Sequence, residues 1–150
     1  MVSRPPGDHE LASQDHVARF FGRRVTKADG RPTWEAFRLR DRELASEYPY
    51  LSTNWMEYFD PVDYNRQTDG VREVVRRKLD IRTGSFAVLN VGDAVAVCQK
   101  TLDIDIRFAV VDNVSDPSHT GVFGYSQYNA ATARLLANLI GPGDLFAAGP

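Results

Sequence analysis

The feature that most constrains the fold is an almost continuous apolar run, Ser-Phe-Ala-Val-Leu-Asn-Val, between Gly84 and Gly92. A short apolar run bounded by turn residues is typical of a strand that is buried on both faces. We therefore predict that residues 86–91 form a central strand of a sheet. Val88 would then lie in the core, and Val88→Asp would prevent folding because it buries an unpaired carboxylate.

Two further strands are indicated downstream of this run. A strict period of two, typical of a strand with one solvent-exposed face, places apolar side chains at Leu102, Ile104, Ile106 and Phe108. Residues 120–125 follow a turn and predict another short strand.

The N-terminal part can be interpreted in two ways. Residues 15–22 alternate as in a strand, but Ser13 or Asp15 would also suit the N-cap of a short helix. A turn signal at 27–32 precedes a second strand-like run at 33–39, and this favours an N-terminal hairpin.

Apolar residues at helical spacing indicate three helices. They are residues 52–59 with Ser52 as N-cap, a segment from Thr68 or Asp69 to Leu79, and residues 126–140 with Ser126 as N-cap and Gly141-Pro142 as the stop. Residues 93–100 fit either a strand or a short helix.

These elements predict an α+β fold, with a sheet of four to five strands and about three helices packed on it. A chain of 150 residues has the size of one domain. We assign residues 13–141 to this single domain, residues 1–12 to a disordered tail and residues 142–150 to a frayed C-terminus.

Charge and cysteine content bear on partners and compartment. The formal net charge of -2 gives no general attraction to nucleic acid or to an anionic membrane. The one cysteine, Cys98, excludes an intrachain disulfide, and we find neither a signal peptide nor an apolar run long enough to span a membrane. We expect a cytoplasmic protein.

No cofactor or metal motif is present in the sequence. One cysteine and three scattered histidines lack zinc-ligand spacing, and neither a P-loop nor a G-x-G-x-x-G motif occurs. We therefore expect no cofactor and no metal. A site formed by His16, His119 and one aspartate is the minor alternative.

His119 follows Pro117 and Ser118 in a turn that leads into a strand. A histidine at a strand end can move protons near neutral pH, or it can simply close the turn with a hydrogen bond. We expect a partly exposed His119 that lines a concavity, so that His119→Ala costs no more than about 1 kcal/mol.

His16 and Arg19 form a second candidate pair at the start of the predicted N-terminal strand. An imidazole with a guanidinium suits phosphate or nucleotide chemistry, because arginine binds phosphate with two parallel hydrogen bonds. His16 and His119 would then act as catalytic acid and base. The plainer interpretation is a histidine at the surface end of a strand.

The stretch Leu51–Phe59 supplies candidate binding residues among aromatic side chains. In a helix, Asn54 and Glu57 would share one face and could orient a ligand beside Trp55, with Ser52 at the helix start. The alternative is an amphipathic helix whose Trp55 fills the core.

Cys98 requires a base within hydrogen-bond reach to act as a nucleophile, and His119 is the candidate. A buried, inert thiol is the favoured interpretation.

Three blocks, LSTNWMEYF, FAVLNVG and DPSHTG, together resemble a family of small uncharacterised bacterial proteins with LSxNWxEYF and PSHxG motifs. The resemblance extends over about residues 13–140. It implies a bacterial protein but brings no activity, so it assigns no role to any residue.

Two functions remain open. The first is a small cytoplasmic bacterial binding or accessory domain that acts through a protein partner, favoured by the small size and the lack of a catalytic motif. The second is a metal-independent enzyme acting on a nucleotide or phosphodiester, with His16 and His119 as acid and base and Arg19 on the phosphate.

Overall fold

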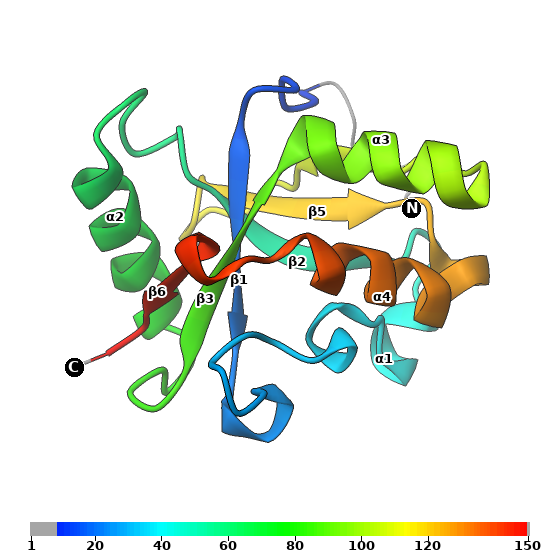
Figure 1. Ribbon diagram of the computed structural model, residues 1–150. Helices are drawn as coiled ribbons and strands as arrows, with labels where there is room; N and C mark the ends of the chain where they lie inside the picture. Colours follow the sequence, from blue (N-terminus) through cyan, green and yellow to red (C-terminus); the bar gives the residue numbers. More distant parts are fainter. Residues whose placement is uncertain (1–8, 150) are drawn as a thin grey trace.

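Six strands of the described chain pair into one antiparallel sheet in the order β4-β5-β2-β1-β3-β6 (Figure 1). The structure is a computed structural model that describes residues 9–149. The strands are β1 (His16–Phe21), β2 (Tyr50–Trp55), β3 (Ser85–Asn90), β4 (Arg107–Val110), β5 (His119–Phe123) and β6 (Leu145–Ala147).

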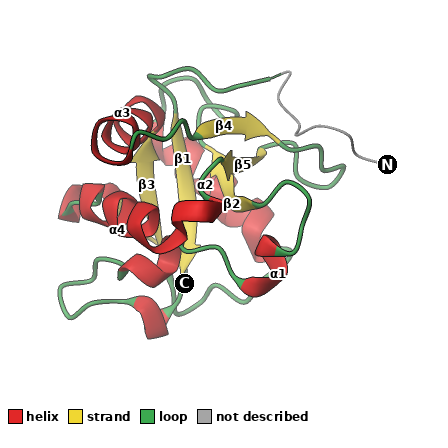
Figure 2. Ribbon diagram, turned by 90° about the vertical axis from the view of Figure 1, so that its right-hand side faces the viewer, coloured by secondary structure: helices red, strands yellow, loops and turns green. Residues whose placement is uncertain are grey.

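The helices of the described chain lie on both faces of this sheet. The α-helices are α1 (Asp41–Leu44), α2 (Tyr64–Arg76), α3 (Val91–Leu102) and α4 (Asn129–Leu139), and the short 3-10 helices are η1 (Arg23–Val25), η2 (Trp34–Phe37), η3 (Ser126–Tyr128) and η4 (Pro142–Asp144). Figure 2 shows α3 and α4 together on one side of the strands. The chain is thus α+β, as predicted, but with more strands and helices than expected.

Alternation along β1 divides the core into two layers. Val17 and Phe21 belong to the cluster beneath α3 and α4, whereas Ala18 and Phe20 pack with residues of α2. We call these two sides the α4 face and the α2 face. Successive side chains of a strand point to opposite faces, so the parity of a residue decides which helices it meets.

The segment 50–55 is a strand, which corrects the predicted helix 52–59 and the predicted N-cap role of Ser52. The aromatic residues that follow are spaced as in a helix, but Leu51 and Thr53 are buried on one face as in a strand. Pairing with both β1 and β5 satisfies the backbone of this segment, and this tertiary context overrides the local pattern.

The predicted N-terminal hairpin is also wrong, although its first strand, β1, is present. Both edges of β1 are occupied by β2 and β3, so residues 33–39 cannot pair there. Residues 34–37 form η2 instead and bury Ala36 and Phe37 on the α4 face.

Boundaries downstream also differ from the predictions, including α2, which begins at Tyr64 and not at Thr68 or Asp69. The ambiguous segment 93–100 lies in α3, whose N-cap Asn90 accepts a hydrogen bond from the Asp93 amide. Because α3 extends to Leu102 and ends at Asp103 in a left-handed conformation, the predicted strand 102–108 shortens to β4. The last helix begins at Asn129 after η3, so Ser126 is not its N-cap.

The apolar run forms β3, an interior strand between β1 and β6, but only β6 separates it from the edge of the sheet. Phe86, Ala87 and Leu89 are buried, on alternate faces. Val88 is only partly buried and lines a cavity, so Val88→Asp would not place its carboxylate in the core as expected from the sequence.

Both ends of the described chain are attached to the sheet. The predicted tail 1–12 lies partly outside the described residues, but within it Leu11 donates to Phe108 and the carbonyl of His9 accepts from Val110, along the outer edge of β4. Residues 142–149, expected to fray, contain η4 and β6, and Phe146 stacks on Phe86 of β3. Backbone pairing and aromatic contact therefore hold this segment in place.

No helix in the described residues is long and apolar enough to cross a lipid bilayer.

Candidate functional site

His16 and Glu57 form a close pair at one end of the sheet. Antiparallel pairing of β1 with β2 continues past Trp55, where the Met56 amide donates to the carbonyl of His16 at 2.9 Å. Glu57 follows directly, and its Oε2 atom lies 2.7 Å from His16 Nδ1 while its Oε1 atom accepts from the His16 amide at 2.7 Å. Both carboxylate oxygens therefore hold one residue.

This contact sets the chemical state of the His16 ring. An ionised carboxylate can only accept, so Nδ1 donates to Glu57, and in the neutral tautomer of the ring the lone pair is on Nε2. The His16 side chain is 41% exposed, and its Nε2 atom has no partner in residues 9–149. Glu57 thus presents a basic nitrogen in a fixed orientation to solvent, an arrangement suited to accept or transfer a proton.

His16 lines two adjoining cavities, of about 670 Å³ and about 440 Å³, which we call the His16 cleft. The cavities share Val88 and Asp144 besides His16. The larger one has a volume typical of ligand pockets. Its rim includes Val62, which is 86% exposed, and Tyr64 at the start of α2.

The His16 cleft is acidic. Its lining contains four carboxylates, from Asp15, Glu57, Asp93 and Asp144. No lysine or arginine among the described residues lines either cavity. Opposite charges attract and like charges repel in such a partly desolvated space, so the lining favours cationic groups over phosphates.

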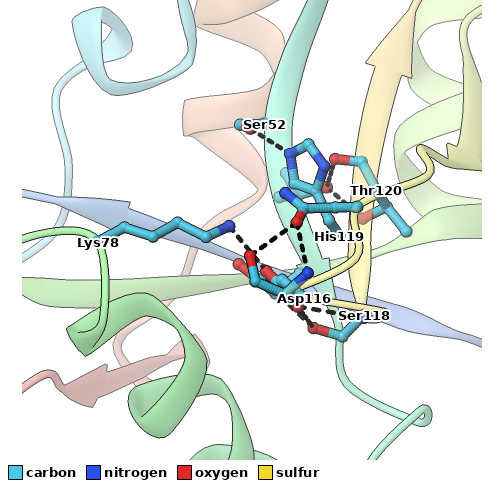
Figure 3. Close-up of polar contacts among 10 residues, drawn as sticks. Ser52, Lys78, Asp116, Ser118, His119 and Thr120 are labelled. Atoms are coloured by element: carbon cyan, nitrogen blue, oxygen red, sulfur yellow. Dashed lines mark hydrogen bonds and ion pairs between the residues drawn. The ribbon is translucent and has the colours of Figure 1, made fainter.

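A second polar cluster surrounds Asp116 and is shown in Figure 3. The carboxylate is fully buried and accepts hydrogen bonds from Asn54 at 2.8 Å and from the Ser118 hydroxyl at 2.6 Å, while Lys78 pairs with it at 3.1 Å. Burial opposes ionisation of Asp116, but the hydrogen bonds from Ser118, Asn54 and Lys78 outweigh it and lower the pKa of the carboxyl. Asn54, Ser118 and Lys78 thus stabilise the ionised carboxylate of Asp116 inside the protein.

His119 starts β5 directly after this cluster, and only 9% of it is exposed. The predicted partly exposed histidine lining a concavity is therefore wrong, because the side chain lies against the sheet, with Tyr50 edge-on to its ring. Nε2 lies 2.7 Å from the Ser52 hydroxyl. Burial, and to a smaller extent the charge of Lys78, lowers the pKa of His119.

Arg19 lies on the α4 face and is committed to the backbone. Its Nε atom donates to the carbonyl of Ala36 at 2.9 Å, and Nη1 donates to the carbonyl of Ser52 at 3.0 Å. The guanidinium fills the space where β1 and β2 diverge, since their pairing in register covers only Val17 and Ala18 of β1. Burial lowers the pKa of Arg19.

Trp55 and Cys98 also lie on the α4 face. Trp55 packs against the core there, with His9 edge-on to its ring. Cys98 is buried, and burial raises the pKa of its thiol to about 11, which keeps it protonated and inert at neutral pH. The interpretation that His119 activates Cys98 is wrong, because the sheet separates the two side chains.

The sequence-predicted residues thus fall into separate groups. Glu57 joins His16, while Ser52 and Asn54 join the surroundings of His119. Both histidines point to the α2 face, but the strand register places their Cα atoms roughly 12 Å apart, from spacings of about 4.8 Å between strands and 3.3 Å along them. His119 lines neither cavity of the His16 cleft.

Several residues of these sites carry no signal in the sequence. Asp144 lies in a segment expected to fray, and Lys78 is one of four basic residues near the end of α2. Asp116 precedes a proline, which indicates only a turn. Among residues 9–149, no group of three or more histidine, cysteine, aspartate or glutamate side chains is placed to hold a metal ion.

Comparisons of the chain with protein-family models, with curated proteins and with solved structures found no match.

Proposed function

We propose that the chain is a cytoplasmic binding domain of a bacterium that acts through a protein partner, and that the His16 cleft takes a basic segment of that partner. The observation that carries this proposal is the charge of the cleft. Four carboxylates line it without a lysine or arginine from the described residues.

The surroundings of the cleft support a protein as the occupant. An arginine or lysine side chain would meet the carboxylates of Glu57 and Asp144, and the free Nε2 atom of His16 could accept one of its hydrogens. Val62 and Tyr64 on the rim offer exposed apolar surface to the neighbouring residues of a peptide. A small cation would contact the carboxylates but not this apolar rim, so the rim favours a peptide as the occupant.

The test uses a fluorescein-labelled tetra-arginine peptide and fluorescence anisotropy. We expect saturable binding that weakens as salt is added, and no binding of a tetra-glutamate peptide. Glu57→Gln and Asp144→Asn should each weaken binding about tenfold, or about 1.4 kcal/mol. Glu47→Gln, at an exposed carboxylate outside the cleft, should leave the affinity unchanged.

Chemical shifts of the ¹⁵N-labelled protein locate the peptide. Changes concentrated at Gln14–Val17, Glu57 and Asp144 would support the proposal. Equal affinity for the Glu57→Gln and wild-type proteins, or shifts spread over the basic end of α2, would refute it.

One observation favours the second function, an enzyme acting on a nucleotide or phosphodiester. The carboxylate-backed ring of His16 faces a cleft, as a general base does. The acidic lining and the commitment of Arg19 to two carbonyls weigh against a phosphate substrate. Hydrolysis of bis(p-nitrophenyl) phosphate that disappears in His16→Ala would reverse this preference.

A further inference from the structure

Ser52 and His119 form a second pair, remote from the His16 cleft. Ser52 lies in β2 opposite Gly121 of β5, so His119, two residues away on the same face, is its diagonal neighbour. Ser52 Oγ lies 2.7 Å from His119 Nε2. A dashed line in Figure 3 marks this contact. This is the hydrogen bond that joins a serine nucleophile to its base.

Ser52 also borders open space. It lines a cavity of about 310 Å³ together with Tyr50 and with Arg42, Glu43 and Ser46 from α1 and the residues after it. The residue that contacts the imidazole is therefore also part of a cavity wall, so a ligand in the cavity would lie next to it.

One tautomer of the ring can activate the hydroxyl. Nδ1 is buried and has no hydrogen-bond partner among the described residues. With the proton on Nδ1, the lone pair on Nε2 is directed at Ser52, and this is the form that a general base requires. Gly121 contributes by its lack of a side chain, because a Cβ atom there would lie 2.6 Å from the ring of Tyr50, which packs on His119.

We propose that Ser52 is a nucleophile for acyl transfer from esters with a small acyl group, and that His119 is its general base. This function is independent of partner binding at the His16 cleft. The cavity of about 310 Å³ has room for a small acyl group such as acetyl.

The reaction proceeds in two steps, acylation of Ser52 and hydrolysis of the acyl-enzyme. Ser52 Oγ bonds to the acyl carbon, its proton passes to His119 Nε2, and the ester bond breaks as that proton moves to the leaving oxygen. A water molecule then gives a proton to Nε2 and its hydroxyl to the acyl carbon. The bond from the acyl carbon to Oγ breaks, the proton returns to Oγ, and the carboxylic acid departs.

Among residues 9–149, no carboxylate accepts from the His119 ring as in a catalytic triad. Asp116, a buried acid beside His119, is bound to Asn54, Ser118 and Lys78 instead of the ring. Loss of the orienting carboxylate lowers turnover in a serine protease on the order of 10⁴-fold. We therefore expect acylation that is slow but specific to one serine.

The first test is modification by a fluorophosphonate, followed by intact mass and peptide mapping. Ser52 Oγ bonds to phosphorus, fluoride leaves, and the proton is taken up by His119. We expect one adduct, on the peptide that contains Ser52, and none in Ser52→Ala. Ser126→Ala, at an exposed serine, should react like the wild type. An adduct elsewhere, or no adduct at Ser52, overturns the proposal.

The second test separates a base from a spectator histidine. Release of p-nitrophenol from p-nitrophenyl acetate should fall at least about 100-fold in Ser52→Ala and in His119→Gln. If His119→Gln does not fold, the pH dependence of the wild-type rate tests the role of His119 instead. The rate should rise with pH only up to the lowered pKa of His119 and be level above it. A rate that rises about tenfold per pH unit through neutrality indicates hydroxide chemistry and overturns the proposal.

Discussion

His16 and His119 stand on the same face of one sheet, each with one ring nitrogen bound, yet their surroundings differ in kind. His16 is half exposed, and a carboxylate holds its Nδ1 atom. His119 is buried, and a neutral hydroxyl lies at its Nε2 atom. The helix α2 packs over the part of the face formed by β1, β3 and β6, and His16 lies at the open end of that layer.

The difference shows how solvent selects the partner of a histidine. Water near His16 screens the Glu57 carboxylate, so a charged partner is tolerated there. At His119 a lone carboxylate would be costly. The buried acid nearby, Asp116, pairs with the cation of Lys78 and accepts hydrogen bonds from Asn54 and Ser118. An open site can exchange a ligand or proton with solvent, whereas a buried site can act only through its neighbour.

The largest expected effect comes from removing the acid that supports the buried site. Asp116→Ala leaves Asn54 and Ser118 without their acceptor and should lower the free energy of unfolding by about 3 kcal/mol or more. Urea denaturation measures this loss. Asp112→Ala, at an exposed carboxylate of the same loop, should cost less than about 0.5 kcal/mol. Similar losses in the two variants would show that the Asp116 cluster does not support the fold.

Alanine substitution of each histidine compares the two sites directly. His119→Ala should cost about 2 kcal/mol, more than expected from the sequence, because it opens a cavity beside Tyr50 and frees the Ser52 hydroxyl. His16→Ala should cost no more than about 1 kcal/mol, since its ring is half exposed. Thermal and urea unfolding of both variants give the order, and a reversed order would contradict the burial contrast.

Acidification should act on the buried histidine. Its pKa is lowered in the folded state, so between about pH 6.5 and that lower value the unfolded chain binds a proton that the folded chain does not. Stability should therefore decrease as pH falls below about 6.5. The lowered pKa of Asp116 adds a further loss at more acidic pH, as its carboxylate becomes protonated.

Urea denaturation at a series of pH values measures this decrease. The His119→Gln variant should show a shallower decrease just below pH 6.5, and it serves as the control. An equal slope in the variant would assign the loss to other groups.

The smallest expected effect is that of a chelator. Among the described residues, no group of three or more histidine, cysteine, aspartate or glutamate side chains is placed to hold a metal ion at either histidine. Dialysis against EDTA should leave Tm unchanged. A decrease of many degrees that zinc restores would show that one of the two histidines is a metal ligand.

The sequence was sufficient for elements whose pattern is unambiguous within a few residues. The alternation in β1 and the apolar run of β3 both indicate strands without knowledge of neighbours. The sequence of β2 predicts a helix because the spacing of Trp55, Tyr58 and Phe59 also fits a helical face. Only the presence of strands on both sides decides the matter, and local sequence does not contain that information.

The sequence identifies individual residues of the candidate site but not which of them lie in contact. His16 and Glu57 were each selected, yet their contact depends on β1 and β2 being antiparallel neighbours. Burial of His119 depends on Tyr50 and on the Asp116 turn. Asp144 and Lys78 come from segments that lie far from both histidines in the chain, so no spacing could point to them.

The strand order also determines how the chain can acquire this structure. β1 occupies the interior of the sheet, but its neighbour β3 is synthesised only after two 3-10 helices, two α-helices and another strand. Among the paired strands, β4 and β5 have the shortest connection. Every other pairing closes a long loop, and the conformational entropy lost in closing it opposes folding until the strand contacts have formed. Folding should accordingly take milliseconds to seconds rather than microseconds. During synthesis, the apolar side chains of Val17 and Phe21 would be exposed until β3, α3 and α4 have been made. We therefore expect β1 to be the segment that a chaperone protects from aggregation.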